Sequence, residues 1–484
     1  MHGIFLSAII SHNEYTLMRP LGPYRLASYL RDHDYQIQVI DFIHRMDKEQ
    51  ILKLVRKFVT PETKFIGFGM MIDYRHPKIM YHHMKMAQVF LLLKRQYPNI
   101  KFIMGGSIGF AWSERWPNGE IFDYIVKGYA EDQILALFDH HYKKKPHPPF
   151  EIIDGNKHLS EHLVINKDFN FSQSRHKWHT SDCIQPGEAL PIEFARGCIF
   201  KCTFCKYPHI GKHKNDFTKD VENIREELIN NFEKFGVNTY YVSDDTMNAD
   251  TAFVKAFTDM SKSLPFKLKY GGFLRLDLIH GNPETVDMFL ENGLSSVYFG
   301  IESFQEDNAK MIGKAWSAKH GKTYLPKIYH DLWKKKIHIS TGLIAGLPHE
   351  PLDVLRNVNK WFIENEMQTW LWHPLYMSRN SNYYKSEFDL NAEKYGFQFK
   401  VVEGKSIWVN DLCNQLEAIE WVKELQNDVK PYTGPTTWGM LELAGLGFDM
   451  EQTAHLKWHQ IPWNKVAEIS NANLAKYIRN LMAL

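Results

Sequence analysis

Short apolar segments alternate with amphipathic helical patterns along most of this 484-residue chain. When each strand is followed by a helix, neighbouring strands run parallel and the helices cover both faces of the sheet. Residues 1–145 are therefore expected to form a doubly wound, Rossmann-like parallel sheet, with ligands bound beyond the carboxyl ends of its strands. The strands are predicted at 3–10, 36–41, 64–70, 100–105 and 123–127, and the helices at 21–32, 47–59, 77–97 and 130–142.

A second alternating series runs from residue 191 to residue 380. Its six strand–helix units predict a partial (β/α)6 barrel, short of the complete form. The strands are predicted at 192–196, 237–243, 268–275, 296–302, 338–345 and 369–376, and the helices at 219–235, 251–264, between Pro283 and Gly293, 323–335 and 351–365.

Two stretches lack this alternation. Residues 146–190 begin with a proline-rich segment and are expected to link the two domains, because proline favours extended chain. Residues 381–484 are rich in Trp and Tyr and predict a small, mainly helical C-terminal domain. Its aromatic side chains form either the core of that domain or a substrate pocket that covers the barrel mouth.

The charge balance limits the classes of partner. The chain has 58 basic and 56 acidic residues, a formal net charge of +2, which argues against a dedicated nucleic-acid surface or a polybasic membrane surface. The apolar run at residues 1–10 has no Lys or Arg before it, so a buried strand is expected there and not a secretory signal. No segment has the length of a transmembrane helix. A cytoplasmic location, in which thiols stay reduced, is predicted.

Three of the five cysteines lie within eight positions of each other, at Cys198, Cys202 and Cys205. Three thiolates on one loop can hold a four-iron cluster. A cluster with only three protein ligands leaves one iron open, and an open position distinguishes a catalytic metal site from a closed structural one.

A structural zinc site is the alternative at this loop, with His209 and His213 as further ligands. Disulfides are disfavoured, because so few cysteines do not suggest a disulfide framework. Cys183 and Cys413 are isolated in the sequence and are expected to be buried structural thiols.

The segment from Arg196 to Cys205 resembles the signature of the radical S-adenosylmethionine superfamily. The resemblance implies that Cys198, Cys202 and Cys205 bind a [4Fe-4S] cluster and that Phe204 packs near the adenine of S-adenosylmethionine. In that family the open iron chelates S-adenosylmethionine, and an electron from the cluster releases a 5′-deoxyadenosyl radical. A reducing partner of the flavodoxin or ferredoxin type is then also implied.

Polar or glycine-rich segments follow four predicted barrel strands, where the active groups of such barrels lie. The family resemblance implies cofactor contacts at seven residues of these segments: Asp244, Asp245, Arg275, Glu302, Ser303, Gly342 and Gly346.

The implied roles of these residues differ. Glu302 and Ser303 would line the ribose or methionine end of S-adenosylmethionine. The backbone from Gly342 to Gly346 would lie against the adenine. The aspartates would lie near the methionine amino group or the substrate, and the fork of Arg275 suits a carboxylate. Helix caps or strand-end turns remain alternatives, above all for the aspartates.

The first domain resembles the cobalamin-binding domain that often precedes a radical S-adenosylmethionine domain. Four segments carry the resemblance: Arg19–Leu30, Val39–Asp41, Gly105-Gly106-Ser107 and Asp123–Glu131.

Within these segments, Gly105 and Gly106 are candidates for close approach to a bulky ligand. The Asp-x-His-x-x-Gly motif that supplies a histidine ligand to cobalt in many cobalamin proteins is absent, although His12 lies in a suitable loop. A domain that has lost its cobalamin is the alternative.

Together these features predict a radical S-adenosylmethionine enzyme that transfers a methyl group to an unactivated carbon with the help of cobalamin. Two alternatives stay open. One is radical chemistry without cobalamin, as in a cyclase, a rearrangement catalyst or a methylthiotransferase. The other is a non-catalytic iron–sulfur or zinc protein. The sequence does not identify the substrate.

Overall fold

The computed structural model describes residues 1–10, 14–72, 79–105, 121–126, 130–146, 170–205, 217–377, 385–402 and 405–484. The chain forms two compact units. The first comprises Met1–Pro191, Asn230–Val237 and Trp463–Leu484, and the second comprises Ile192–Ile229 and Asn238–Pro462. Among the described residues, no helix is both long and apolar enough to cross a membrane.

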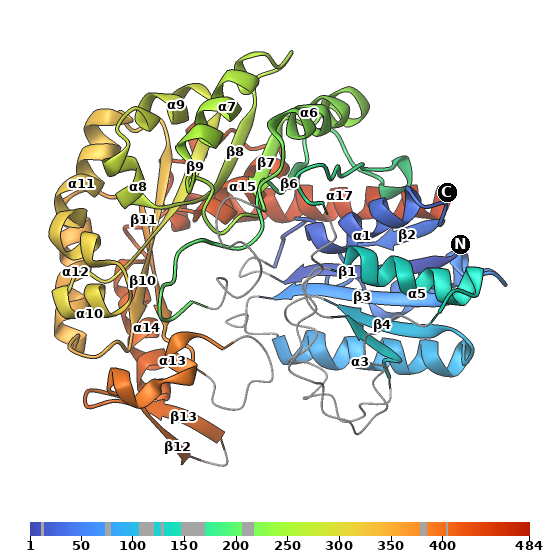
Figure 1. Ribbon diagram of the computed structural model, residues 1–484, viewed down its shortest axis with the longest axis horizontal. Helices are drawn as coiled ribbons and strands as arrows, with labels where there is room; N and C mark the ends of the chain where they lie inside the picture. The colour runs from blue at the N-terminus through green and yellow to red at the C-terminus, as the bar shows by residue number, and fades with distance from the viewer. Residues whose placement is uncertain are drawn as a thin grey trace. The chain divides into compact units, whose positions relative to one another are not determined.

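The first unit is an α/β domain. Its main elements are β1 (Gly3–Ile10), α1 (Leu21–Arg31), β2 (Ile37–Ile40), α2 (Lys48–Phe58), β3 (Phe65–Ile72), α3 (Ile79–Gln96), β4 (Lys101–Gly105), β5 (Tyr124–Val126), α5 (Glu131–Lys143) and α17 (Trp463–Ala483). The five strands form a parallel sheet in the order β2-β1-β3-β4-β5 (Figure 1). Every residue of β1 is buried, as expected for a central strand covered on both faces. Helix α1 packs against α5 and α2 packs against α3, which confirms the doubly wound fold.

A buried arginine joins distant parts of the first unit. Arg19 is fully buried, and its guanidinium donates to the two carboxylate oxygens of Glu188 at 2.7 and 3.0 Å. It also donates to the hydroxyl of Tyr24 at 2.6 Å, which donates in turn to Asp41 at 2.9 Å. The backbone N–H of Asp41 donates to the hydroxyl of Tyr477 at 2.8 Å. Arg19 and Asp41 lie in two segments that resemble the cobalamin-binding domain, and here they stabilise the unit from within.

The structure divides the chain differently from the expected boundaries in two places. Residues 170–190, expected to be part of a linker, belong to the first unit. Arg31 donates to Asp182 in this segment at 2.8 and 3.1 Å. Helix α17, expected to lie in a C-terminal domain of residues 381–484, also belongs to the first unit, where it contacts α2. Both segments are held by contacts with residues far away in sequence.

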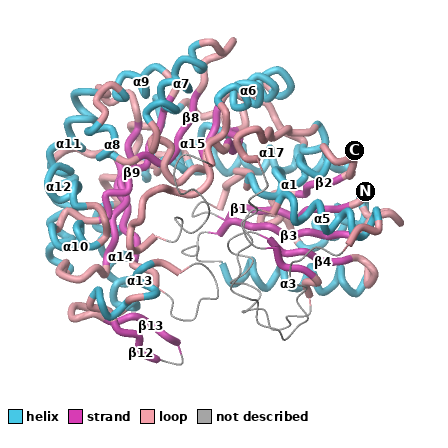
Figure 2. Tube along the Cα trace, in the orientation of Figure 1, coloured by secondary structure: helices cyan, strands magenta, loops and turns pink. Residues whose placement is uncertain are grey.

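The second unit repeats the alternation of strands and helices (Figure 2). Its strands are β7 (Thr239–Val242), β8 (Lys269–Leu274), β9 (Leu294–Glu302), β10 (His338–Ala345) and β11 (Thr369–Pro374), together with β6 (Ala189–Ile192), of which only Ile192 falls within the unit's bounds. They form a six-stranded sheet in the order β11-β10-β9-β8-β7-β6, which agrees with the six-unit partial barrel. The helices are α6 (Val221–Phe235), whose residues from Asn230 onward are counted with the first unit, α7 (Thr251–Lys262), α8 (Leu276–Gly281), α9 (Thr285–Glu291), α10 (Glu306–Met311), α11 (Lys322–Lys327), α12 (Leu352–Glu364), α13 (Glu387–Leu390), α14 (Gln415–Val429), α15 (Thr437–Gly445) and α16 (Met450–Thr453).

Two local features of the second unit differ from the predictions, and a third adds to them. Strand β6 ends at Ile192, whereas a strand was expected at 192–196. The helix expected at 323–335 is α11 followed by a π-helical turn at Ile328–Leu332. The C-terminal region is not only helical, because β12 (Gln398–Val402) and β13 (Lys405–Val409) form an antiparallel pair.

Candidate functional site

The cysteine loop is closed at its base by backbone pairing. Ala195 forms an antiparallel bridge with Thr218, and Arg196 N–H donates to the Phe217 carbonyl at 3.0 Å. This pairing explains why the chain leaves the sheet before residue 196. The backbone groups of residues 195 and 196 bond to residues 217 and 218, where the loop ends, and not to a neighbouring strand. The predicted cluster ligands therefore share one loop with a fixed base.

The three thiols of this loop are reduced and partly exposed. Cys198 Sγ lies 3.4 Å from the hydroxyl of Thr246, and Arg275 Nη1 donates to Cys202 Sγ at 3.6 Å. A hydroxyl and a guanidinium therefore lie beside two of the three sulfurs. Their placement fits an anionic iron–sulfur cluster, whose properties depend on hydrogen bonds to sulfur.

The zinc alternative needs ligands that surround a single metal ion. Among the described residues, no three His, Cys, Asp or Glu side chains gather around a position for one metal ion. His209 and His213, the further ligands of the zinc alternative, lie outside the described residues.

Arg275 is held rigidly beside the cysteine loop. Asp277 accepts two hydrogen bonds from its guanidinium, at 3.0 and 2.6 Å, and the guanidinium carbon lies 4.0 Å from the centre of the Phe200 ring. Asn248 bonds to both the N–H and the carbonyl of Arg275 at 2.9 Å. Burial disfavours the charge of Arg275, but Asp277 and Cys202 keep its pKa above the ordinary value. The carboxylate that pairs with Arg275 in this structure is thus one of the chain's own.

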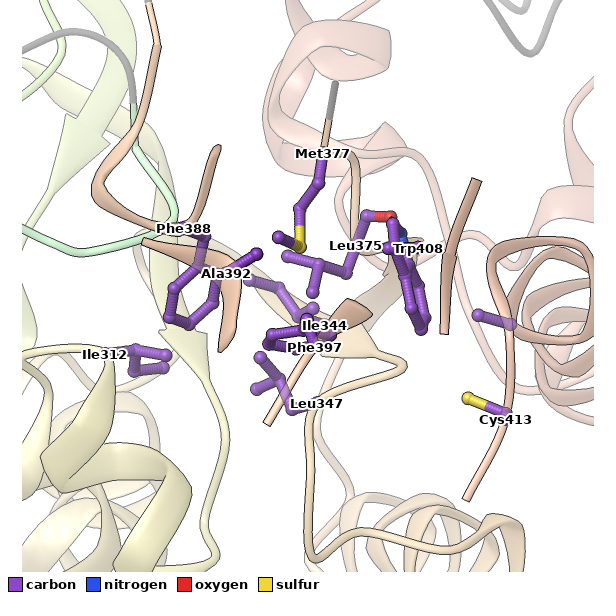
Figure 3. Close-up of a cluster of buried hydrophobic side chains, with 11 residues drawn as sticks. Ile312, Ile344, Leu347, Leu375, Met377, Phe388, Ala392, Phe397, Trp408 and Cys413 are labelled. Atoms are coloured by element: carbon purple, nitrogen blue, oxygen red, sulfur yellow. The ribbon is translucent and has the colours of Figure 1, made fainter. Parts of the chain in front are cut away.

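Phe204 is partly buried against an apolar cluster at the end of the cysteine loop. Figure 3 shows this cluster, which brings together side chains from β10, the segment after β11 and the C-terminal region. Its members are Ile312, Ile344, Leu347, Leu375, Met377, Phe388, Ala392, Phe397, Trp408, Cys413 and Ala418. The predicted contact of Phe204 with adenine remains a prediction.

The two isolated cysteines are buried, as predicted. Burial raises the pKa of Cys183 to about 11 and that of Cys413 to about 12. Both thiols therefore stay protonated at neutral pH, as expected for structural residues.

The two aspartates after β7 have different surroundings. Asp244 is buried, and its carboxylate accepts a hydrogen bond from the Phe194 N–H at 2.8 Å, just before the cysteine loop. This contact fits the strand-end alternative. Burial raises the pKa of Asp245 to about 7, so its carboxyl group is partly protonated at neutral pH. A proton-binding carboxyl group is typical of functional sites.

Glu302 has a strained backbone at the end of β9. Its φ angle is +69°, in a region that non-glycine residues rarely adopt, and such strain clusters at functional sites. The carboxylate lies over Gly300, where an added Cβ would be 2.3 Å from Glu302 Oε1. Lys314 Nζ lies 4.0 Å from the same oxygen and donates to the Gly300 carbonyl at 2.7 Å. Burial nevertheless keeps the pKa of Glu302 raised.

Ser303 contacts a residue that the sequence analysis missed. Its hydroxyl donates to Glu350 Oε1 at 2.9 Å, and the amide of Asn308 donates to Glu350 Oε2 at 2.9 Å. Glu350 is only 2% exposed. Glu350 comes four positions after Gly346, at the predicted glycine-rich strand end. This closeness in sequence is the one feature that could have marked it as a site residue.

Replacing Glu350 with Gln is expected to flatten the pH dependence of stability between about pH 4.5 and 7. Burial raises the pKa of Glu350 from 4.5 to about 7, so over this range the folded protein keeps a proton that the unfolded chain releases. The free energy of unfolding therefore falls as pH rises. The stabilisation is complete below about pH 4.5, and up to about 3 kcal/mol is lost by pH 7.

Chemical denaturation at about pH 5 and pH 7.5 measures this difference for the wild type and for Glu350→Gln. The exposed-site variant Glu424→Gln is the control and should keep the wild-type slope. Equal slopes in the wild type and Glu350→Gln would contradict the expectation.

Gly342 and Gly346 leave room for protein side chains. A Cβ at Gly342 would lie 2.1 Å from the hydroxyl of Tyr298, and one at Gly346 would lie 2.6 Å from the Trp408 ring. The Tyr298 hydroxyl forms a hydrogen bond with His373 Nε2 at 2.9 Å. Close packing explains both glycines, and a role against adenine stays a prediction. The sequence analysis did not single out Tyr298 or His373, because neither lies in a recognised motif.

The predicted ligand loops of the first unit are only partly described. Gly105 ends β4, and among the described residues the atom nearest to an added Cβ is the Val126 carbonyl oxygen at 3.8 Å. Gly106 and His12 lie outside the described residues.

Comparison with known proteins finds a family match that lies mostly within the second unit. Residues 192–361 match the family model of the Radical SAM superfamily. No curated protein gives a significant sequence match. Among solved structures, the radical S-adenosylmethionine methyltransferase TsrM from Kitasatospora setae, with cobalamin and a [4Fe-4S] cluster bound, superposes with a TM-score of 0.66 at 14% identity, over 98% of this chain and 100% of that one. The cobalamin-dependent S-adenosylmethionine radical enzyme OxsB superposes with a TM-score of 0.54 at 17% identity, over 82% of this chain and 56% of that one.

Proposed function

Because this chain carries a radical S-adenosylmethionine domain behind a domain of the cobalamin-binding type, we propose that it is a cobalamin-dependent radical methyltransferase acting on an unactivated carbon. The observation that carries the proposal is the likeness to TsrM over 98% of this chain, which spans both units. A likeness limited to the barrel would support radical chemistry alone.

The residues of the second unit fit a [4Fe-4S] cluster held by Cys198, Cys202 and Cys205. When bound, the cluster and S-adenosylmethionine supply an electron and an organic radical. The chain orients the cluster ligands through Arg275 and Thr246, which contact two of the sulfurs. The cluster further needs a reductant, and we propose a flavodoxin or ferredoxin type.

We also propose two residues of the barrel as contacts of the cofactor or the substrate. Glu302 at the end of β9 and Asp245 just after β7 are carboxyl groups with raised pKa, and burial is the main cause for both. We propose that they bind the charged methionine end of S-adenosylmethionine or the substrate. A cation or an N–H donor beside either carboxylate would offset its burial.

Cobalamin is proposed for the first unit on the basis of its fold. Strands β1, β3 and β4 are parallel, so their carboxyl ends lie at one edge, where doubly wound sheets bind ligands. Gly105, the last residue of β4, lies at that edge. The absence of the Asp-x-His-x-x-Gly motif favours one alternative, radical chemistry without cobalamin.

Anaerobic purification with added hydroxocobalamin tests the proposal. About four iron atoms and one cobalt per chain are expected, together with cleavage of S-adenosylmethionine to 5′-deoxyadenosine under dithionite. Iron without cobalt would remove the methyltransferase proposal and leave radical chemistry. Zinc in place of iron would overturn both.

Replacing Arg275 with Gln is expected to make the reduction potential of the cluster more negative. Reduction adds negative charge to the cluster, and a guanidinium 3.6 Å from Cys202 Sγ stabilises that charge. Asp277→Asn should shift the potential the opposite way, because Asp277 offsets the charge of Arg275. Redox titration monitored by electron paramagnetic resonance measures both shifts. Equal potentials in Arg275→Gln and the wild type would contradict this role.

A further inference from the structure

The strand order of the first unit locates the edge at which a ligand is expected. Strand β2 lies on one side of β1, and β3, β4 and β5 follow one another on the other side, so the order reverses between β1 and β3. Ligands of doubly wound sheets bind beyond the carboxyl ends of the strands at such a switch point. The segment that follows β1 therefore borders the expected ligand position, and residues 14–20 are the part of it that the structure describes.

A helix from the far end of the chain holds this segment. Ser470 of α17 is fully buried, and its hydroxyl donates to the Tyr15 carbonyl at 2.7 Å. The two residues are 455 positions apart in the sequence. The bond restricts the backbone at Tyr15, because breaking it would leave a buried hydroxyl without this acceptor.

Arg45 links the same helix to the segment that follows β2. Its Nη1 donates to the Ser470 hydroxyl at 2.8 Å, and its Nη2 donates to Asn471 Oδ1 at 2.7 Å. The guanidinium carbon also lies 5.7 Å from the centre of the Tyr15 ring. A guanidinium serves two acceptors at once from its rigid fork, which suits it to this position. These contacts join α17 to the segments that follow two adjacent strands, β1 and β2.

We propose that Arg45 and Ser470 are positioning residues for the ligand site of the first unit, and that α17 holds the segment at Tyr15 in its ligand-binding position. A segment that is already ordered favours binding, because less conformational entropy is lost when the ligand arrives. The inference rests on the proposed function, which supplies cobalamin as the ligand at this edge.

Spectrophotometric titration of the iron–sulfur-loaded protein with hydroxocobalamin tests the inference. Arg45→Met removes both hydrogen bonds of the guanidinium and keeps an unbranched side chain. Its affinity for hydroxocobalamin is expected to fall about tenfold, as the loss of one or two hydrogen bonds would give. Arg45→Lys should recover only part of this loss, because an ammonium lacks the fork that reaches two acceptors.

Hydrogen exchange of the protein without cobalamin gives a readout that does not depend on the ligand. In Arg45→Met and Ser470→Ala, the amides of residues 14–19 should exchange faster, whereas those of β1 should keep their protection. Arg56→Met is the matched control. Arg56 Nε donates to Gln96 Oε1 at 3.2 Å, which joins α2 to α3 without the contacts of α17, so affinity and exchange should stay at the wild-type level.

The possible failures can be told apart. Wild-type affinity in Arg45→Met, or unchanged exchange at residues 14–19, would overturn this inference and leave the proposed function. Faster exchange that extends equally through β1 would also overturn it, because the contacts would then stabilise the whole unit and not this segment. If the wild type itself does not bind hydroxocobalamin, the cobalamin-dependent function is wrong and this inference falls with it.

Discussion

Cys202→Ala is expected to lose both bound iron and cleavage of S-adenosylmethionine. The loop supplies three cysteines, so removing one leaves two thiolates, too few to hold a four-iron cluster. Cys202 is also the sulfur that Arg275 contacts at 3.6 Å, so the variant removes the anchor between the cluster and the strand-end guanidinium. Iron content, the visible absorption of the cluster and 5′-deoxyadenosine formation measure the loss.

Cys413→Ala is the matched control for this experiment. Cys413 is equally a reduced cysteine of the second unit, but it is buried in the apolar cluster next to Trp408 and Ala418. Its replacement should cost about 1 kcal/mol of stability and leave iron and cleavage unchanged. Retained cleavage in Cys202→Ala would contradict the ligand assignment, and loss of iron in both variants would point to unfolding.

The alternating architecture could be predicted from local pattern. Strand β1 was expected at residues 3–10 and lies at Gly3–Ile10, because a fully buried parallel strand is an unbroken apolar run. Helix α2 was expected at 47–59 and lies at Lys48–Phe58, where Asp47 caps its start and its apolar positions recur at helical spacing. In both cases the residues that decide the structure are neighbours in sequence.

The groups that the site brings together could not be predicted in the same way. Glu350 accepts hydrogen bonds from Ser303 and Asn308, and the Tyr298 hydroxyl lies 2.9 Å from His373 Nε2. Each pairing joins residues of different elements of the second unit, so no single segment contains its signal. The cysteine loop differs, since the three cysteines that we propose as cluster ligands all lie within one segment.

The membership of α17 in the first unit was missed for the same reason. Tyr477 on this helix is fully buried and meets the Asp41 backbone at the end of β2. A periodic helix pattern predicts that one face is buried but does not identify its partner. Segments 170–191 and α17 were therefore expected outside the unit that they complete.

The buried ion pair of the first unit leads to the other large expected effect. Glu188→Gln should lower the local free energy of unfolding of the first unit by about 3–5 kcal/mol, because it leaves the guanidinium of Arg19 buried without its counter-charge. Hydrogen exchange of the amides in β1 and β2 measures the change, and their protection should fall together.

We infer that Glu188→Gln lowers stability because it leaves the charge of Arg19 unpaired, and not because one side chain has changed. The double variant Arg19→Met with Glu188→Gln should therefore regain stability relative to Glu188→Gln, because no unpaired buried charge remains. At the surface, Glu424 pairs with Arg356 where both side chains are well exposed, so Glu424→Gln should leave exchange nearly unchanged. If Glu188→Gln exchanged like the wild type, solvent or another carboxylate would have to compensate Arg19. The network from Glu188 through Tyr24 to Asp41 would then not be what holds residues 170–191 and α17 to the sheet.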